Sequence, residues 1–266
     1  MTIRFGHTEV TRKKTALSFE FFPPRSDKMT RRLWCAIGQL ELLDPEFFSV
    51  TYGALGSAID GRLRDLYGKG IRRVLALRGD CDDDNANERL AYRDSVAFVE
   101  GIRKISDFDI TVAAYPEVHP RAQNAAADLV FLKRKFEADA SRAITQFFFD
   151  ADTFLRFRDS AAACGLDSIV PGILPVHDYA AVCKFSQRCG ASIPARYAEH
   201  FEGMEGNASA QYHLAVDLAT ELCQKLIDEG VDALHFYTLN RTDLCFAICQ
   251  HLGSEIATQA QVKMVA

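Results

Sequence analysis

Seven apolar runs along this chain each end abruptly in a polar or turn residue, and a helical segment follows each run. The six clearest runs are SFEFF, FFSVTYG, VLALRGD, TVAAYPEVHP, AITQFFFD and LHFYTLNR. Repeated strand-then-helix units require a parallel sheet. The runs are almost continuously apolar, as expected of strands covered on both faces. We therefore expect an α/β fold, a TIM-type (β/α)8-like barrel with one βα unit shortened or missing.

The alternative arrangement, a doubly wound open sheet, is disfavoured by the glycine pattern. The nearest glycine cluster, YGALGSAIDG, contains neither G-x-G-x-x-G nor GK[ST]. No low-complexity linker divides the chain, so we expect one catalytic domain over residues 1–266. A polar arm at 1–14 and a tail at 254–266 flank it. The expected helices lie at about 27–43, 60–69, 88–105, 121–139, 151–164, 178–189 and 242–252.

Composition excludes several classes of function. The net charge of -5 and the pI near 5.8 provide no broad basic field, so nucleic acid is not an expected partner. No apolar run approaches the roughly 18 residues needed to cross a bilayer, and the amino terminus lacks a signal-like apolar core. We expect a cytoplasmic protein. Its eight scattered cysteines, without a CxxC pair, are expected to be reduced thiols.

The polar residues at the strand ends are expected to form one active site, because the catalytic groups of a barrel gather at the carboxyl ends of its strands. Glu20 interrupts an apolar strand, and a buried carboxyl that stays protonated near neutral pH serves as a general acid. The alternative role for Glu20 is a structural ion pair with an arginine across the barrel. Asp80 follows Arg78 and Gly79, where it either tunes an electron-deficient cofactor or caps a helix.

Downstream residues add possible ligand contacts. The loop AAYPEVHP supplies Tyr115 and His119, which suit an aromatic ring and a phosphate, whereas a metal site is not expected. Three polar residues on the following helix could hold a ribose and a pyrophosphate, or could form a solvated face. They are Asp128, Arg134 and Lys135.

The later strands end in residues that admit two interpretations. Gln146 fits either a bidentate ligand contact or a core amide network. Phe185 is typical of an amphipathic helix by pattern alone. The last strand ends with His235, Tyr237 and Arg241, and that arginine could reach a carboxylate.

Eight blocks of this sequence resemble the methylenetetrahydrofolate reductase family, in its bacterial single-domain form, and occur in the order found there. They are SFEFFPPR, SVTYGA, LALRGD, AAYPEVHP, LKRK, AITQFFFD, PGILPV and HFYTLNR. This resemblance implies a flavoprotein barrel in which NADH or NADPH reduces FAD, and the flavin reduces 5,10-methylenetetrahydrofolate to 5-methyltetrahydrofolate. It implies that Glu20 is the general acid and that Asp80 lies beside the flavin and the pterin.

The same resemblance implies further roles, residue by residue. Folate would contact Gln146, Phe185 and Arg241. FAD would contact Thr51, Arg78, Gly79, Asp80, Tyr115, His119, Asp128, Arg134 and Lys135.

The chain departs from the family pattern in three places. About thirty residues, amounting to one βα unit, are absent between SVTYGA and VLALRGD. Phe131 replaces an asparagine, and Ala181 replaces a glutamine that touches folate. The missing unit leaves two outcomes open: a barrel of seven strands closed by altered packing, or a gap filled by a partner subunit. Because edge strands leave backbone groups unsatisfied, we expect a homo-oligomer, most simply a dimer. Two alternative functions remain open: a flavin-independent reductase of the same substrate, and a folate-binding or nucleotide-binding protein that has lost turnover.

Overall fold

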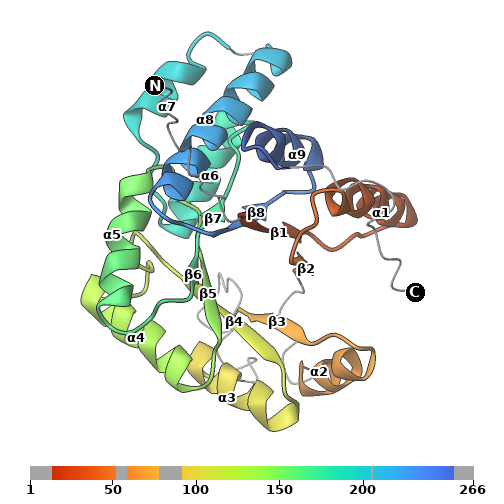
Figure 1. Cartoon of the computed structure of the whole chain (residues 1–266), viewed down its shortest axis with the longest axis vertical. Helices are drawn as coiled ribbons and strands as arrows, with labels where there is room; N and C mark the ends of the chain where they lie inside the picture. The colour runs from red at the N-terminus through yellow and green to blue at the C-terminus, as the bar shows by residue number, and fades with distance from the viewer. Residues whose placement is uncertain (1–13, 52–58, 78–91, 205, 255–266) are drawn as a thin grey trace, which may run out of the picture.

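A computed structural model describes residues 14–51, 59–77, 92–204 and 206–254. Every strand pairing in it is parallel, as the alternation of strands and helices predicts. The strands lie at the centre and the helices lie around them (Figure 1). The strands are β1 (Ala16–Phe21), β2 (Phe47–Val50), β3 (Arg73–Ala76), β4 (Asp109–Ala114), β5 (Arg142–Thr145), β6 (Ile169–Val170), β7 (Gly172–Ile173) and β8 (Ala233–Tyr237).

Strands β6 and β7 are the two halves of a single strand position of the barrel, interrupted only by Pro171. We call each strand position of the barrel a stave. Proline has no N–H to donate to a ladder. β6 pairs with β5, β7 pairs with β8, and the Pro171 carbonyl accepts from the His235 amide at 3.0 Å. Counted this way, the described strands form seven staves in the order β3-β4-β5-β6/β7-β8-β1-β2. The expected barrel-like arrangement with seven evident strands is confirmed.

The helices largely match the expected positions, with two corrections. They are α1 (Asp27–Glu41), α2 (Ile59–Gly68), α3 (Ser95–Ile105), α4 (Ala125–Glu137), α5 (Ala151–Ala162), α6 (Tyr179–Cys189), α7 (Ala195–Phe201), α8 (Ala208–Asp228) and α9 (Thr242–His251). First, α3 and α4 begin later than expected because the Asp94 and Asn124 side chains cap them, accepting from backbone amides at 2.8 and 2.9 Å. Second, the sequence analysis assigned one helix to each strand and so omitted α7 and α8.

Each group of strands packs its outer face against its own helices. Around β1, β2 and β8, a core of buried aromatic and aliphatic side chains includes Phe19 and Phe236, whose rings stack 5.6 Å apart. A second core lies between β3, β4, β5 and helices α2 to α4, with Ile110 and Val112 fully buried. Each large apolar side chain removed from water contributes about 1.5–3 kcal/mol. Each of the two groups of staves is therefore stabilised by its own hydrophobic core, between the strands and the helices that cover them.

The hydrogen-bonded ladder is interrupted between β2 and β3. In the described part of the chain, no pairing joins these two strands, although every other neighbouring pair of staves is joined. In Figure 1 they face each other across the open side of the ring of strands, with α1 and α2 on either side. Val50, the last residue of β2, is 39% exposed, and Leu77, which directly follows β3, is 40% exposed. The interruption lies at the place in the sequence where the βα unit is missing.

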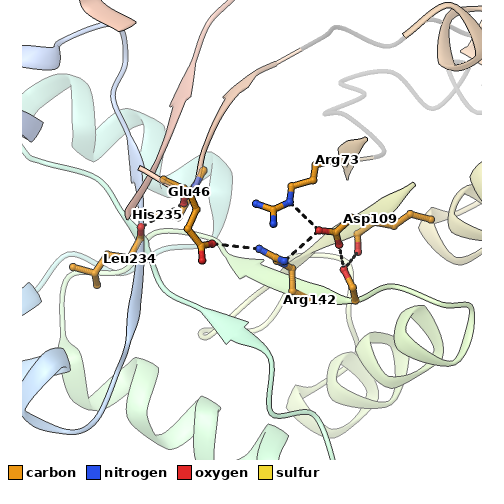
Figure 2. Close-up of polar contacts among 9 residues, drawn as sticks. Glu46, Arg73, Asp109, Arg142, Leu234 and His235 are labelled. Atoms are coloured by element: carbon orange, nitrogen blue, oxygen red, sulfur yellow. Dashed lines mark hydrogen bonds and ion pairs between the residues drawn. The ribbon is translucent and has the colours of Figure 1, made fainter. Parts of the chain in front are cut away.

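Side chains link the two groups of staves at the amino ends of the strands (Figure 2). The Asp109 carboxylate accepts from Arg73 at 3.0 Å and from Arg142 at 3.2 Å. Arg142 also lies 3.6 Å from Glu46, just before β2, and the Arg73 guanidinium lies 5.4 Å from the centre of the Phe47 ring. We call Glu46, Arg73, Asp109 and Arg142 the charge network. It connects β3, β4 and β5 to β2 where the ladder does not.

Two further expectations concern the whole chain. No helix in the described segments is long and apolar enough to cross a membrane. Seven cysteines are described and all are free thiols, as predicted; of these, Cys223, Cys245 and Cys249 pack in the core beneath α8 and α9. The terminal segments 1–13 and 255–266, which hold most of the expected arm and tail, lie outside the described residues.

Candidate functional site

Glu20 lies near the carboxyl end of β1 and points into the barrel. Strand alternation sends Leu17, Phe19 and Phe21 to the helical side and leaves Glu20 on the interior face. Its side chain is only 14% exposed. Thr51, just after β2, donates its hydroxyl to Glu20 Oε1 at 3.0 Å. The predicted alternative, an ion pair between Glu20 and an arginine, is not found among the described residues.

A buried histidine lies beneath Glu20. His235 on β8 is fully buried, and its Nε2 lies 3.8 Å from Glu20 Oε2 with no hydrogen-bond partner among the described residues. Its Nδ1 lies 2.8 Å from the hydroxyl of Ser18, which precedes Glu20 by two residues on the same face of β1. A buried imidazole nitrogen without a hydrogen-bond partner is costly. Ser18, His235 and Glu20 form a connected polar set on the interior face of the barrel.

The wall beside Glu20 is built by a close approach of β8, β7 and β5, and Tyr237 of β8 is the register partner of Glu20 on the neighbouring strand. Tyr237 on β8 donates its hydroxyl to the Thr145 carbonyl on β5 at 2.7 Å, passing over Gly172 on β7. A Cβ at Gly172 would lie 2.2 Å from that same carbonyl oxygen, so only glycine fits. Burial, reinforced by the nearby Glu20 charge, raises the pKa of Tyr237 well above its ordinary value. Tyr237 therefore remains a neutral hydrogen-bond donor.

The loop after β4 is held rigidly at the same end of the barrel. Val118 has φ 75°, a left-handed conformation that costs a β-branched residue about 1–3 kcal/mol. The Glu117 carboxylate accepts from the Ser192 amide at 3.0 and 3.1 Å, and Asp128 accepts from the His119 amide at 2.7 Å. The rings of Tyr115 and His119 meet edge to face, 4.5 Å apart. The structure thus brings together three of the predicted cofactor residues: Tyr115, His119 and Asp128.

Helix α4 presents two cations beside this loop. Lys135 is buried and donates to the Ala113 carbonyl at 2.8 Å. Burial lowers its pKa to about 8, with Asp128 partly opposing that effect. Arg134 and Lys135 lie 5.7 and 5.1 Å from the centre of the Phe131 ring. A buried ammonium without an ion pair among the described residues suits an anionic ligand.

Two predicted substrate residues lie next to each other. Gln146 follows β5 directly, and its side-chain oxygen accepts from the Phe147 amide at 3.0 Å. The Phe147 ring stacks on Phe185 of α6 at 5.3 Å, and Phe185 is 39% exposed. The outer face of Phe185 is therefore available to a flat ligand. A core amide network around Gln146 is not seen among the described residues.

Arg241 lies in the loop between β8 and α9. Its guanidinium pairs with Asp243 at 3.3 Å and its side chain is 44% exposed. Burial, together with the nearby Arg241 charge, lowers the pKa of His177. Three other predicted residues, Arg78, Gly79 and Asp80, lie outside the described residues, as does the acidic loop at 81–88.

One residue of the interior polar set, Ser18, escaped the sequence analysis. Ser18 shares the strand face of Glu20 at a spacing of two, which is a usable signal. The partnership of Ser18 with His235 joins residues 217 positions apart, which strand alternation alone does not reveal.

Comparison with known proteins matches this chain to the family described as methylenetetrahydrofolate reductase, over residues 6–62 and 56–253. The 5,10-methylenetetrahydrofolate reductase of Escherichia coli (strain K12) is 40% identical over 270 residues, covering 89% of this chain and 90% of that protein. The protein of the same name from Buchnera aphidicola subsp. Schizaphis graminum (strain Sg) is 36% identical over 273 residues, covering 90% and 92%.

The same comparisons locate the missing unit. Eighty-nine per cent of 266 residues is about 237, so about 33 of the 270 positions aligned with the Escherichia coli protein have no residue in this chain. The two matched segments meet at residues 56–62, between β2 and β3. The predicted deletion of about one βα unit agrees in both size and position.

One solved structure has a similar fold. It is an uncharacterized protein from Clostridium thermocellum, described as binding two copies of 5-methyl-5,6,7,8-tetrahydrofolic acid. Its TM-score is 0.56 at 12% sequence identity, covering 91% of this chain and 96% of that one. At that identity the likeness concerns the fold alone.

Proposed function

This chain belongs to the methylenetetrahydrofolate reductase family, and from that premise we propose how it works. It reduces 5,10-methylenetetrahydrofolate to 5-methyltetrahydrofolate, with NADH or NADPH as the source of hydride and FAD as the carrier. The observation that carries this proposal is the Glu20, His235 and Ser18 set at the strand ends of a barrel 40% identical to an enzyme of that name. The enzyme is an oxidoreductase.

The residues present fit FAD at the end of the cofactor that carries its pyrophosphate. Lys135 is a buried cation that donates to a backbone carbonyl, and Arg134 lies beside it on α4. Tyr115 and His119 offer ring edges, and Asp128 offers a carboxylate oxygen. When bound, FAD supplies a site that takes hydride from the nicotinamide and returns it to folate. Arg78, Gly79, Asp80 and Thr51 complete the proposed contacts.

Glu20 acts on the folate. Its carboxyl gives a proton to the bridging nitrogen that leaves the methylene carbon, so that the five-membered ring opens. The methylene carbon becomes an electrophilic iminium, which gains hydride and becomes the methyl group. Asp80 is proposed to stabilise the positive charge of that iminium. Glu20 regains its proton from solvent before the next turnover. His235, with Nε2 3.8 Å from Glu20 Oε2 and its ring held by Ser18, positions the Glu20 carboxyl.

The remaining site residues position the substrate. Phe185, backed by Phe147, offers an aromatic face against which a pterin or a nicotinamide stacks in turn. Gln146 hydrogen-bonds the pterin, and Arg241 meets a carboxylate of the folate. One stacking face used by both substrates in turn corresponds to a ping-pong cycle.

We also propose that one cytoplasmic domain carries the whole site and that it assembles as a homodimer. The argument for assembly is the pair of strands β2 and β3, which have no ladder partner across the interruption among the described residues. Exposed Val50 and Leu77 beside them add apolar surface that a partner would cover.

Half-reactions test the catalytic proposal. Glu20→Gln removes the acid but leaves the flavin contacts in place. NADH should reduce the flavin of this variant at the normal rate. Reoxidation of the reduced flavin by 5,10-methylenetetrahydrofolate should slow by about 10²–10⁴-fold. Glu100→Gln, an exposed glutamate on α3, is the matched control and should leave both steps unchanged. Equal folate rates in the two variants would remove Glu20 from the mechanism.

Direct transfer of labelled hydride from the nicotinamide to folate, in a preparation free of flavin, would instead favour the flavin-independent reductase. If the unmodified protein bound folate without turning it over, the result would favour the other alternative, a folate-binding protein that has lost turnover.

A further inference from the structure

A carboxylate bonds the loop after β4 to the end of helix α6. Glu117 lies in the middle of that loop, and both of its carboxylate oxygens accept from the Ser192 backbone amide, at 3.0 and 3.1 Å. Ser192 lies three residues beyond Cys189, the last residue of α6. The bond therefore joins two elements that are 75 positions apart in the sequence. We call this contact the Glu117 clamp.

The Glu117 clamp lies over a tight contact between the two backbones. Gly190, the residue that caps α6, has φ 72°, and a Cβ placed on it would lie 3.0 Å from the Pro120 ring. Val118 has φ 75°, a conformation that a β-branched residue keeps only where its surroundings fix it. Residues of the loop and of the end of α6 line a hollow with no room for a water molecule. The loop and the helix end are therefore fixed directly against each other.

The two elements that the Glu117 clamp joins hold the two reactants of the proposed function. Tyr115 and His119 belong to the loop and are proposed to contact FAD. Phe185 belongs to α6 and offers the stacking face, backed by the Phe147 ring at 5.3 Å. Hydride transfer needs the reacting atoms about 3–3.5 Å apart, and a displacement of about 1 Å can cost about 10²-fold in rate. The gap between the flavin and a stacked ligand depends on how the loop and α6 are fixed together.

We propose that Glu117 is a positioning residue for hydride transfer. Its carboxylate holds α6 against the loop after β4, and it thereby sets the gap between the flavin and the ligand stacked on Phe185. This inference rests on the proposed function, because it takes the flavin to lie at the loop and both substrates to stack on Phe185 in turn. Both half-reactions use the same gap, so both depend on the Glu117 clamp, whereas Glu20 serves the folate half-reaction.

Rapid mixing of the FAD-loaded enzyme at saturating substrate tests the proposal. Glu117→Ala removes the acceptor, so flavin reduction by NADH and flavin reoxidation by 5,10-methylenetetrahydrofolate should both slow by about 10–100-fold. Glu117→Gln keeps a side-chain oxygen for the Ser192 amide, and both of its rates should stay within about threefold of the unmodified enzyme. Normal rates in Glu117→Ala, or equally slow rates in the two variants, overturn the proposal.

The Glu117 clamp can also be opened from the side of its donor. Ser192→Pro removes the amide hydrogen while Glu117 stays in place, and it should slow both half-reactions as Glu117→Ala does. Ser192→Ala keeps that amide and should leave both rates unchanged. Normal rates in Ser192→Pro, or rates as slow in Ser192→Ala as in Ser192→Pro, would contradict the proposal.

A further variant separates position from stability. Asn207, the exposed cap of α8, accepts from the Ala210 amide at 3.0 Å, so Asn207→Ala removes the same kind of bond away from the site. It should lower the Tm about as much as Glu117→Ala does and leave both half-reactions at their normal rates. If Asn207→Ala slowed both steps as much as Glu117→Ala, lost stability would explain the result and the proposal would fail.

A double-variant cycle tests whether Glu117 acts through Phe185. Phe185→Ala removes the stacking face, so Glu117→Ala should slow flavin reduction much less in that background than in the unmodified enzyme. Two factors that simply multiply would show that Glu117 acts independently of Phe185, and would overturn the proposal. A failure of the proposed function has a different result, because the unmodified enzyme would then lack one or both half-reactions before any substitution is made.

Discussion

The charge network makes a quantitative prediction about how the barrel tolerates a missing stave. Asp109 is its central member, because its carboxylate accepts from both Arg73 and Arg142, and it also accepts from the Ser141 hydroxyl. Asp109→Asn removes the negative charge with almost no change in shape. Two guanidinium groups would then converge on a neutral amide, and the connection through Arg142 to Glu46 would lose its anchor (Figure 2).

The magnitude follows from the exposure of the three side chains. Asp109, Arg142 and Arg73 are 28%, 21% and 43% exposed, which places them between surface pairs and buried pairs. Surface pairs contribute about 0–1 kcal/mol, and breaking a buried pair costs about 3–5 kcal/mol. We expect Asp109→Asn to lower the free energy of unfolding by about 2 kcal/mol. In a chain of this size that corresponds to a fall in Tm of about 4–8 °C.

Urea unfolding followed by far-UV circular dichroism measures this loss. The matched control is Asp152→Asn, which makes the same chemical change in an exposed pair with Lys225 at 2.6 Å. That pair is solvated on both sides, so its loss should be barely measurable. If the two variants lose the same stability, the charge network does not hold the two groups of staves together, and the reasoning fails.

Three further predictions concern the site. FAD affinity should be highest below pH 8 and should fall as the pH rises through about 8, because the Lys135 ammonium, whose pKa burial lowers to about 8, loses its charge there. Fluorescence titration checks this, and a Lys135→Met variant that keeps the same pH dependence would contradict it. Gly172→Ala should cost about 2 kcal/mol or more in thermal unfolding, because its Cβ would lie 2.2 Å from a backbone oxygen. Gly61→Ala, where nothing lies within 4 Å, should cost nothing, and equal costs would refute the steric argument. His235→Asn should slow the folate half-reaction by about 10–100-fold and shift its pH profile, with flavin reduction by NADH unaffected. Rapid mixing would show an unchanged folate step if His235 were only a packing residue beneath Glu20.

Local pattern in the sequence was enough to predict the strands, whereas the position of the missing unit was predicted from the resemblance to the family. Apolar runs ending in polar residues correspond to β1, β2, β3, β4, β5 and β8, and the run containing Pro171 corresponds to β6 and β7. Each of these signals lies within a few consecutive residues. The interruption of the ladder between β2 and β3 follows directly from the segment that is absent there.

Features that depend on distant partners were not predictable in the same way. The interior set pairs Ser18 with His235, and the charge network joins Glu46 to Arg142 across the barrel. These contacts depend on strand register, which is set by the packing of the whole sheet. Likewise, α8 was omitted because a strict alternation of one strand and one helix leaves no place for it, although its 21 residues have a regular helical pattern.

The central claim is that a barrel lacking one βα unit still carries hydride from a nicotinamide to folate through FAD. The most direct measurement is the visible absorption spectrum of the purified protein loaded with FAD, without oxygen. The account predicts that NADH or NADPH bleaches the flavin band and that 5,10-methylenetetrahydrofolate then restores it, with 5-methyltetrahydrofolate as the product. A protein that binds no FAD, or a bleached flavin that the folate does not reoxidise, would contradict it.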